Sequence, residues 1–318
     1  MKAVMYHYVR PVPADMPHFR YLHVDGFRRQ LDWLEATVGF VSRDAFMGAL
    51  EGGPVPGGAV LTFDDAFSDH YDHVFHELSA RRLWGVFYAP TAILRSDRLL
   101  DVHRIHVLLG RVGGTRALEA AMRLVDDAML SHGTVDAFRR QTYTRQDNDA
   151  DTTTFKRVMN YFISYEHRAA ILDRLMAAFG MDAATEAAMK RDFYVDAGQL
   201  RRMAGGGMTI GSHGANHLLM SKLSEPEQRA EIAASFGALA DVLDAPVETF
   251  CYPYGGFHSF DATTERLLDE AGARYSFNVE PRDVTAADLS GRPQALPRWD
   301  CNAFPHGRAH YGPTAPPA

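Results

Sequence analysis

The sequence predicts an α/β fold, an incomplete (β/α)7-type barrel with a helical insertion. Short apolar segments of strand character alternate along the chain with amphipathic helical patterns, as in a parallel sheet whose strands are joined by helices. At 318 residues with 46% hydrophobic side chains, the chain is long and apolar enough for one barrel domain. Between about residues 95 and 195 the strand patterns stop and helical patterns continue, which predicts an insertion among the loops that line a barrel's active site.

The individual elements follow from apolar spacing and from capping and turn residues. Strands are expected at residues 1–10, near Val41, and at 59–64, 85–90, 208–212, 249–252, 274–279 and 295–299. Helices are expected at residues 24–38, 46–50, 68–78, 155–162, 171–179, 196–205, 225–243 and 262–271. Ser68 and Asp196 can cap two of these helices through their side-chain oxygens. The pattern predicts a single domain over residues 1–305, insertion included, and a loose proline-rich tail over 306–318.

Two adjacent carboxylates end the strand expected at residues 59–64. The run from Ala59 to Phe63 is largely apolar, and Asp64 and Asp65 follow it directly. A buried strand would bring two like charges to the edge of the sheet, and their repulsion must be relieved by protonation, by a cation or by separate roles for the two groups. A metal site with a neighbouring base fits this demand.

Two histidines, His213 and His217, follow the strand expected at residues 208–212 in a turn flanked by glycines. Their spacing lets both imidazoles face one ion on a helical turn or in a compact loop. With Asp65 they form a set of two imidazoles and one carboxylate, which leaves positions open for water and substrate, as catalytic metal sites do. Zinc suits these ligands, and the same set accepts iron, cobalt or nickel.

At these residues the chain resembles the polysaccharide deacetylase superfamily, carbohydrate esterase family four. The resemblance rests on three motifs in matching order, Thr62-Phe63-Asp64-Asp65, Ser212-His213-x-x-x-His217 and Phe250-Cys251-Tyr252-Pro253-Tyr254-Gly255, and it covers roughly residues 2–300. It implies an incomplete deacetylase barrel and one divalent metal ion bound by Asp65, His213 and His217. In this family Asp64 occupies the position of the base, and the backbone N–H of Tyr254 that of the oxyanion hole.

Two positions depart from the family pattern. Cys251 stands where the family commonly carries an arginine that pairs with the base, and the family's late Leu-His, whose histidine is the acid, is missing. Arg298 follows Leu-Pro in the last expected strand, from which it can reach Asp64 in a barrel. His7 lies in a Tyr-His-Tyr context that resembles deacetylases whose acid motif has moved to the N-terminus. A structural ion pair for Arg298 and a buried core histidine for His7 are the alternatives.

Aromatic residues near the strand ends are candidates for substrate contacts. Tyr252, Tyr254 and Trp299 suit the face of a sugar or an acetyl-sized pocket, and core packing is the alternative. Two further histidine groups have helical spacing and are expected to be surface or structural residues: His70, His73 and His76, and His103 with His106.

The leading functional prediction is metal-dependent hydrolysis of the N-acetyl group of an amino sugar, with release of acetate. The expected substrate is a nucleotide-linked sugar, a lipid-linked sugar or a short oligosaccharide. One alternative is a deformylase or other amidohydrolase that acts on a lipid-linked sugar or a small ureide. Another is a non-catalytic carbohydrate-binding descendant, which would have lost Asp64 or a metal ligand.

Composition limits the partners. The net charge of −7 gives no basic footprint for nucleic acid, and no apolar run reaches membrane-spanning length. The N-terminal residues lack the features of a signal peptide, which predicts a cytoplasmic protein. The two cysteines, Cys251 and Cys301, give no disulfide framework. Nothing in the pattern indicates an oligomeric state.

Overall fold

A computed structural model describes residues 1–13, 15–131, 138, 140, 142–144 and 146–311. The chain divides into two compact units. Unit 1 comprises Met1–Pro11, Tyr21–Arg95 and Phe193–Ala309, and unit 2 comprises Val12–Arg20, Ser96–Asp192 and the residues from His310. Unit 2 thus contains most of the segment in which the sequence predicts an insertion. The organisation as a single domain over residues 1–305 stays a prediction.

Unit 1 is built on a seven-stranded sheet. Its strands are β1 (Lys2–Tyr6), β4 (Ala59–Asp64), β5 (Val86–Ala89), β6 (Thr209–Ser212), β7 (Thr249–Cys251), β8 (Tyr275–Phe277) and β9 (Trp299–Asp300). They are hydrogen-bonded in the order β8-β7-β6-β5-β4-β1-β9, and each neighbouring pair is parallel. Parallel strands joined by helices confirm the predicted incomplete (β/α)7-type barrel.

The first strand of the sheet lies beside the last. β1 pairs with β9 in the register Val4–Trp299 and Met5–Asp300. On the other side, Leu296 forms an isolated parallel bridge to Phe277 at the end of β8. Arg298 therefore lies in a short segment that contacts both ends of the sheet.

The last strand is shorter than the one predicted at residues 295–299. Residues Pro293–Ala295 form a 3₁₀ helix, and β9 covers Trp299–Asp300. Proline has no N–H to donate to a neighbouring strand and fits the first turn of a helix, so Pro293 favours the helical turn.

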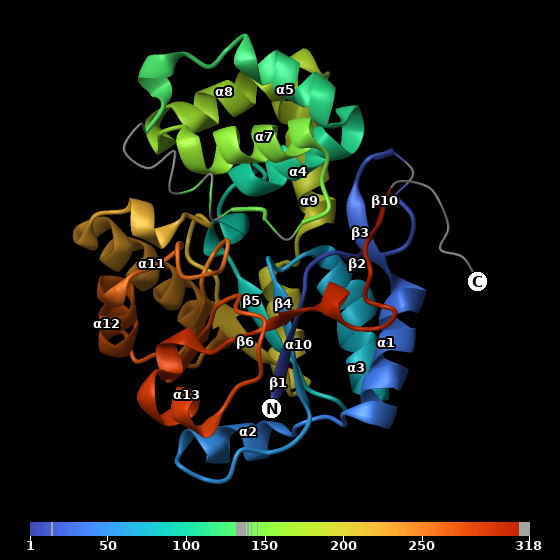
Figure 1. The fold of residues 1–318 in the computed structure, drawn as a ribbon, viewed down its shortest axis with the longest axis vertical. Coiled ribbons are helices and arrows are strands. Elements are labelled where there is room, and N and C mark those ends of the chain that lie inside the picture. The colour runs from blue at the N-terminus through green and yellow to red at the C-terminus, as the bar shows by residue number, and fades with distance from the viewer. Residues whose placement is uncertain (14, 132–137, 139, 141, 145, 312–318) are drawn as a thin grey trace. The chain divides into compact units, whose positions relative to one another are not determined.

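Most helices of unit 1 lie where the sequence predicts them. The α-helices are α1 (Val24–Thr37), α2 (Arg43–Leu50), α3 (His76–Ala80), α10 (Ala197–Gly205), α11 (Glu225–Leu243), α12 (Ala262–Glu270) and α13 (Ala286–Gly291), of which α13 is not predicted. Short 3₁₀ helices cover Thr91–Leu94, Met220–Lys222 and Cys301–Ala303. Asp196 caps α10 in a capping box with Gln199, as its position predicts. Figure 1 shows α1 and α3 on one side of the central strands of unit 1, and α11 and α12 on the other.

The helix predicted to start at Ser68 begins differently. A π-helical segment covers His70–Phe75 and continues into α3, with Asp69 at the N-cap position and no side-chain cap. The Asp69 carboxylate instead accepts hydrogen bonds from Val9 N at 3.1 Å and from Arg10 Nε at 2.8 Å. It thereby holds β2 (Val9–Arg10), which pairs with β3 (Arg20–His23).

A row of stacked aromatic side chains links the central strands. Tyr6 of β1 stacks on Phe63 of β4 with ring centroids 5.2 Å apart, and Phe63 stacks on Phe87 of β5 at 4.6 Å. All three residues are buried. Such pairs stabilise a fold by about 0.5–1.5 kcal/mol each beyond the area they bury. The row fixes the strand whose end carries Asp64 beside the strand that leads to His7.

The start of the predicted tail is packed against unit 1. Gly307 is buried, and Ala309 N donates a hydrogen bond to Asn302 Oδ1 at 2.8 Å. Residues 312–318, the remainder of the predicted tail, lie outside the described residues.

Unit 2 is mainly helical. Its described α-helices are α4 (Asp101–Val112), α5 (Gly114–Met122), α7 (Ala150–Arg157), α8 (Tyr165–Ala178) and α9 (Ala183–Phe193), which runs on into unit 1; a 3₁₀ helix covers Asp127–Met129, a π-helical segment covers Val158–Phe162, and β10 is His310–Tyr311. Arg104 is buried and pairs with Glu186 through Nε and Oε1 at 3.1 Å. His103 is buried and packs against His106 with ring centroids 5.8 Å apart. Among the described residues, no helix combines the length and apolar character needed to cross a membrane.

Candidate active site

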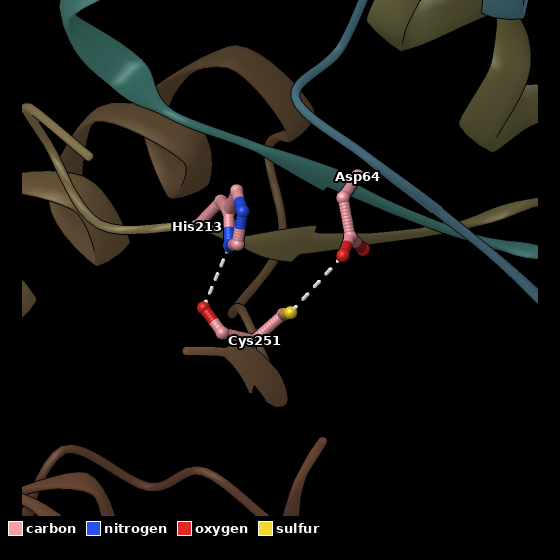
Figure 2. A group of neighbouring side chains, drawn as sticks. All are labelled: Asp64, His213 and Cys251. Carbon is pink, nitrogen blue, oxygen red and sulfur yellow. Dashed lines mark hydrogen bonds between the residues drawn. The ribbon is translucent and has the colours of Figure 1, made fainter. Parts of the chain in front are cut away.

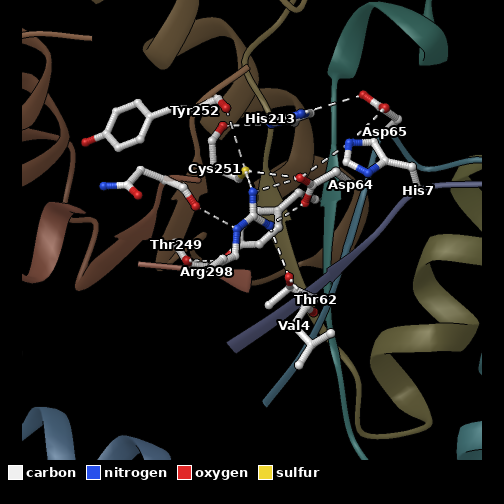
Figure 3. Close-up of polar contacts among 12 residues, drawn as sticks. Val4, His7, Thr62, Asp64, Asp65, His213, Thr249, Cys251, Tyr252 and Arg298 are labelled. Carbon is white, nitrogen blue, oxygen red and sulfur yellow. Dashed lines mark hydrogen bonds and ion pairs between the residues drawn. The ribbon is translucent and has the colours of Figure 1, made fainter. Parts of the chain in front are cut away.

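The carboxyl ends of the strands of unit 1 bring most of the predicted site residues together. Asp64 ends β4, His213 follows β6, and Tyr254 lies in the turn after β7. His7 follows β1. Because the strands are parallel, these ends meet at the same edge of the sheet, where parallel α/β folds bind their ligands. Figure 3 shows His7, Asp64, Asp65 and His213 converging there.

The backbone turns sharply after Asp64. Asp65 has a φ of 82° and Ala66 a φ of 54°, left-handed conformations that residues with a Cβ rarely adopt. In an undisturbed strand two successive side chains would point to opposite faces. Here both carboxylates face His7, whose Nε2 lies 3.9 Å from Asp64 Oδ2 and 4.0 Å from Asp65 Oδ2. Backbone strain of this kind is characteristic of functional sites.

Asp65 forms a cluster with the two predicted histidines. Its Oδ1 lies 3.3 Å from His217 Nε2 and 3.6 Å from His213 Nε2. One ligand atom from each residue lies within 4.8 Å of the others, and all three residues are buried. Two imidazole nitrogens and a carboxylate oxygen around one point are a ligand set for zinc and related metals. The donor atoms therefore fit a divalent metal ion.

The orientation of His213 suits a metal ligand. Its Nδ1 lies 2.7 Å from the carbonyl oxygen of Cys251. A carbonyl can only accept, so Nδ1 carries the proton and the lone pair of Nε2 faces Asp65. Burial, and next the neighbouring His217, lower the pKa of His213 to about 4. The imidazole is therefore neutral at neutral pH, as a metal ligand must be.

The loop between the two histidines is held by Glu231 of α11, a residue the sequence analysis missed. Its Oε2 accepts hydrogen bonds from Ala215 N and Asn216 N, both at 2.9 Å, and the Asn216 side chain donates to Oε1. Below this loop, Ser212 Oγ donates to Ser235 Oγ at 2.7 Å. A signal was present in the sequence, because Glu231 and Ser235 lie on the apolar face of the predicted helix, where polar side chains need partners.

Asp64 is paired with Arg298, as the position of Arg298 predicts. Arg298 Nη1 donates to Asp64 Oδ1 and Nη2 to Oδ2, both at 2.8 Å, and both residues are buried. The guanidinium is fixed in turn by Thr62 Oγ1 at 3.1 Å and by the Asn278 carbonyl at 3.0 Å (Figure 3). Burial alone would raise the pKa of Asp64, but the charges and hydrogen bonds around it, chiefly those of Arg298, lower it to about 2.

Cys251 forms a second group with Asp64 and His213, shown in Figure 2. Its Sγ lies 3.6 Å from Asp64 Oδ2 and accepts a hydrogen bond from Arg298 Nη2 at 2.9 Å. Burial raises the pKa of this thiol well above its ordinary value. A protonated thiol beside a guanidinium is a poor ligand, because a cation placed there would meet the charge of Arg298. The Asp65 cluster is therefore the better metal site.

His7 is more exposed than the other site residues. Its side chain is 40% exposed, whereas those of Asp64 and Asp65 are 2% and 4% exposed. The His7 carbonyl accepts a hydrogen bond from His70 Nε2 at 2.8 Å, so the buried His70 is a structural residue, as predicted for its group. The backbone of His7 is thus fixed, while its ring remains accessible from outside.

The structure separates the three predicted aromatic residues. The Tyr254 ring lies against His217, with centroids 5.0 Å apart, and its backbone has a φ of 68°. Tyr252 is buried, and its hydroxyl donates to the Gln294 carbonyl at 2.5 Å. Trp299 donates from Nε1 to Asp283 Oδ1 at 2.8 Å. Tyr254 therefore lies at the metal cluster, while Tyr252 and Trp299 make contacts within the fold.

Comparison with known families and proteins followed from this geometry. Residues 149–276 match the family model described as "Polysaccharide deacetylase". The matched residues include β6, β7, His213 and His217, whereas Asp64 and Asp65 precede them. A search of curated proteins found no match.

Solved structures share the fold. The deacetylase PplD of Streptococcus pyogenes, in complex with acetate, is 14% identical with a TM-score of 0.55, covering 94% of this chain and 91% of that chain. IcaB from Ammonifex degensii is 18% identical with a TM-score of 0.53, covering 94% and 90%. A de-N-acetylase from Aggregatibacter actinomycetemcomitans is 14% identical with a TM-score of 0.54, covering 94% and 93%. At these identities the likeness establishes the fold.

The barrel and the family match define the class of protein, a hydrolase that acts on carbon–nitrogen bonds. The family is that of the polysaccharide deacetylases, which confirms the resemblance predicted from the three sequence motifs.

Proposed function

We propose that this protein removes the N-acetyl group of an amino sugar by metal-dependent hydrolysis and releases acetate. The observation that carries the proposal is the cluster of Asp65, His213 and His217 beside a second carboxylate, Asp64, which Arg298 holds in place. A ligand set next to an oriented base is what hydrolysis of an unactivated amide requires. The family match supports a sugar as the substrate.

A divalent metal ion is proposed to lie between Asp65, His213 and His217. When bound, it supplies a Lewis acid that polarises the acetyl carbonyl and lowers the pKa of a neighbouring water. Imidazole and carboxylate ligands suit zinc, and iron, cobalt and nickel are compatible with the same set. The neutral state of His213 supports binding at neutral pH.

Asp64 is the proposed base. With a pKa of about 2 its carboxylate is ionised at neutral pH and can accept a proton from the attacking water. A carboxylate of such low pKa is a weak base, so its contribution comes mainly from position. Arg298 supplies that position, because two parallel hydrogen bonds fix both the plane and the direction of the carboxylate.

His7 is the proposed acid. As water attacks, a C–O bond forms at the acetyl carbon, one water proton passes to Asp64, and the C–N bond breaks as His7 donates a proton to the departing nitrogen. The exposure of the His7 ring and its distance of 3.9 Å from Asp64 support this assignment. The backbone N–H of Tyr254 is the proposed donor to the developing oxyanion, since Tyr254 packs on His217 in a turn of fixed geometry.

The proposed substrate is an N-acetylated sugar that is nucleotide-linked, lipid-linked or part of a short oligosaccharide. A cytoplasmic location, which would favour such precursors, stays a prediction. The presence of both Asp64 and the full ligand set argues against a non-catalytic carbohydrate-binding protein.

The proposal is tested by measuring acetate release from a panel of N-acetylated sugars with protein of known metal content. We expect acetate from at least one sugar, loss of release after chelation and recovery when zinc is restored. Asp64→Asn serves as the control for contaminating activity. Release of formate or ammonia without acetate would support the deformylase or ureide alternative, and a metal-loaded protein that releases none of these would contradict the proposal.

A further inference from the structure

One large apolar side chain beside the site is exposed. Phe257 is 48% exposed, in a part of the chain where its aromatic neighbours Tyr252 and Phe260 are buried. It follows Tyr254 by three residues in the loop after β7. Single exposed apolar residues are common, so exposure alone assigns no role to Phe257. The construction of the loop distinguishes this residue.

The loop that carries Phe257 is held rigidly. Tyr254, Gly255 and Gly256 have consecutive φ values of 68°, 63° and 72°. A Cβ on Gly255 would lie 2.2 Å from Val279 Cγ2, so this position requires glycine. On the far side of Phe257, Ser259 N donates to the Gly256 carbonyl at 3.0 Å. Phe257 is therefore presented by a fixed turn rather than by a freely moving loop.

Phe257 also rests on a built support. Its ring packs on Phe260 with centroids 5.7 Å apart, and Phe260 stacks on Tyr252 at 3.7 Å with an interplanar angle of 7°. The guanidinium of Arg292 lies 5.0 Å from the Phe257 ring centroid. Arg292 is held there by Glu265, which accepts from its Nε at 2.9 Å and from its Nη2 at 2.6 Å. An exposed aromatic ring is thus combined with a fixed hydrogen-bond donor group.

The position of Phe257 relates it to the proposed active site. Three residues span at most about 10 Å, so Phe257 lies within that reach of Tyr254. The Tyr254 ring in turn lies 5.0 Å from the proposed metal ligand His217. A sugar linked to the one being deacetylated, rather than the acetylated sugar itself, would therefore meet Phe257.

We propose that Phe257 and Arg292 form a subsite for a neighbouring sugar residue of the same substrate molecule. The substrate is then an oligosaccharide or a longer glycan rather than a monosaccharide. The C–H face of a pyranose is apolar and covers an aromatic ring, while the guanidinium donates hydrogen bonds to sugar hydroxyls. Tyr252, expected from the sequence to contact the sugar, acts through Phe260 as a support. This inference rests on the proposed function, because it assumes that the acetylated sugar occupies the site at Asp65.

The test compares N-acetylglucosamine with its β-1,4-linked tetramer. For Phe257→Ala, the ratio of kcat/KM for the tetramer to kcat/KM for the monomer should fall roughly two- to tenfold, mainly through the KM of the tetramer, as expected for loss of one aromatic contact. Phe257→Tyr, which keeps the ring, should restore the ratio. Met122→Ala is the matched control, since Met122 is 53% exposed and belongs to unit 2. An unchanged ratio in Phe257→Ala overturns the inference.

A binding measurement separates this inference from the proposed function. In the Asp64→Asn background, the tetramer should bind more tightly than the monomer, and Phe257→Ala should remove most of the difference while Met122→Ala leaves it intact. A wild-type protein that releases no acetate, yet shows this pattern of binding, contradicts the proposed function and supports the subsite. Equal binding of the tetramer and the monomer overturns the subsite.

Discussion

Asp64 and Asp65 are adjacent, buried and at the end of the same strand, yet their surroundings differ in kind. Asp64 faces a cation, the guanidinium of Arg298, through two hydrogen bonds of 2.8 Å. Asp65 faces two imidazole nitrogens, those of His213 and His217, at 3.6 Å and 3.3 Å. Because the pKa of His213 is lowered to about 4, its imidazole brings no positive charge at neutral pH.

This contrast shows how one strand end accommodates two like charges. The charge of Asp64 is balanced by the protein, which leaves that carboxylate ionised and oriented. Asp65 and its neutral imidazoles make a concave group of donors, whose natural counterion is a divalent metal. The left-handed backbone of Asp65 makes the difference possible, since it directs the second carboxylate away from the arginine and toward the histidines.

The largest expected effect is on the imidazole side. His213→Ala should reduce bound metal to background and abolish acetate release, because the carboxylate and one imidazole give too few ligands. Metal content is measured by elemental analysis and folding by circular dichroism. His76→Ala, an exposed histidine outside the cluster, is the matched control and should keep both metal and activity. Full metal content in both His213→Ala and His217→Ala would contradict the ligand assignment.

The next effect concerns the acid. His7→Ala should keep metal but lower kcat for the amide by about 10²–10⁴-fold, the usual contribution of a general acid. An ester with a good leaving group should lose much less, because that group departs without protonation. The two substrates are compared at saturating concentration on the same preparation. Equal losses on both would assign His7 a positioning role instead.

On the arginine side the expected effect is on stability. Arg298→Leu leaves a buried carboxylate without its cation and should lower the free energy of unfolding by about 3–5 kcal/mol. Arg274→Leu, which breaks an exposed pair with Glu51, should cost about 0–1 kcal/mol. Both values come from denaturant titrations of metal-free protein. Arg298→Lys, a milder change, serves if Arg298→Leu does not fold, and a cost equal to that of Arg274→Leu would refute a buried, charge-balancing pair.

The same pair predicts a pH dependence of the metal-free protein. The pKa of Asp64 falls from its ordinary 3.8 to about 2 on folding, so its ionised form contributes stability above pH 3.8 that is lost as the pH falls toward 2. In Arg298→Leu, burial without the cation should raise this pKa, so the variant loses stability as the pH rises through that range. Unfolding curves from pH 2 to 5 distinguish the two slopes.

A smaller effect is expected from the loop that carries the histidines. Glu231→Gln loses the charge that binds two backbone N–H groups and should destabilise the protein by about 1–3 kcal/mol. Asp241→Asn, an exposed change on the same helix, is the control. Metal affinity should also fall in Glu231→Gln, because the histidine loop is less well held. Unchanged stability and affinity would show that α11 does not organise the site.

Local signals account for what the sequence predicts correctly. The capping box at Asp196 and the helix 225–243 depend on neighbouring residues, and both are found. The cluster of Asp65 and the two histidines follows from strand ends and spacing. The end of the last strand does not, because β9 pairs with residues of β1 almost the whole chain away.

Side-chain direction is the part that the sequence leaves open. Tyr252 and Tyr254 are two residues apart in one motif, but Phe260 and Gln294 hold the first in the core and His217 packs on the second. These partners come from other elements, so the motif alone does not decide between them. Glu231 is missed for the same reason, since its role depends on a loop that begins on a different strand.

The central claim is that the two carboxylates have separate roles, and a pair of isosteric variants tests it most directly. Metal content and turnover are measured side by side for Asp64→Asn and Asp65→Asn. The account predicts that Asp64→Asn keeps its metal and loses turnover by about 10²–10⁴-fold, while Asp65→Asn loses the metal and, with it, turnover. Loss of metal from Asp64→Asn together with full metal in Asp65→Asn, or near-normal turnover in Asp64→Asn, would contradict it.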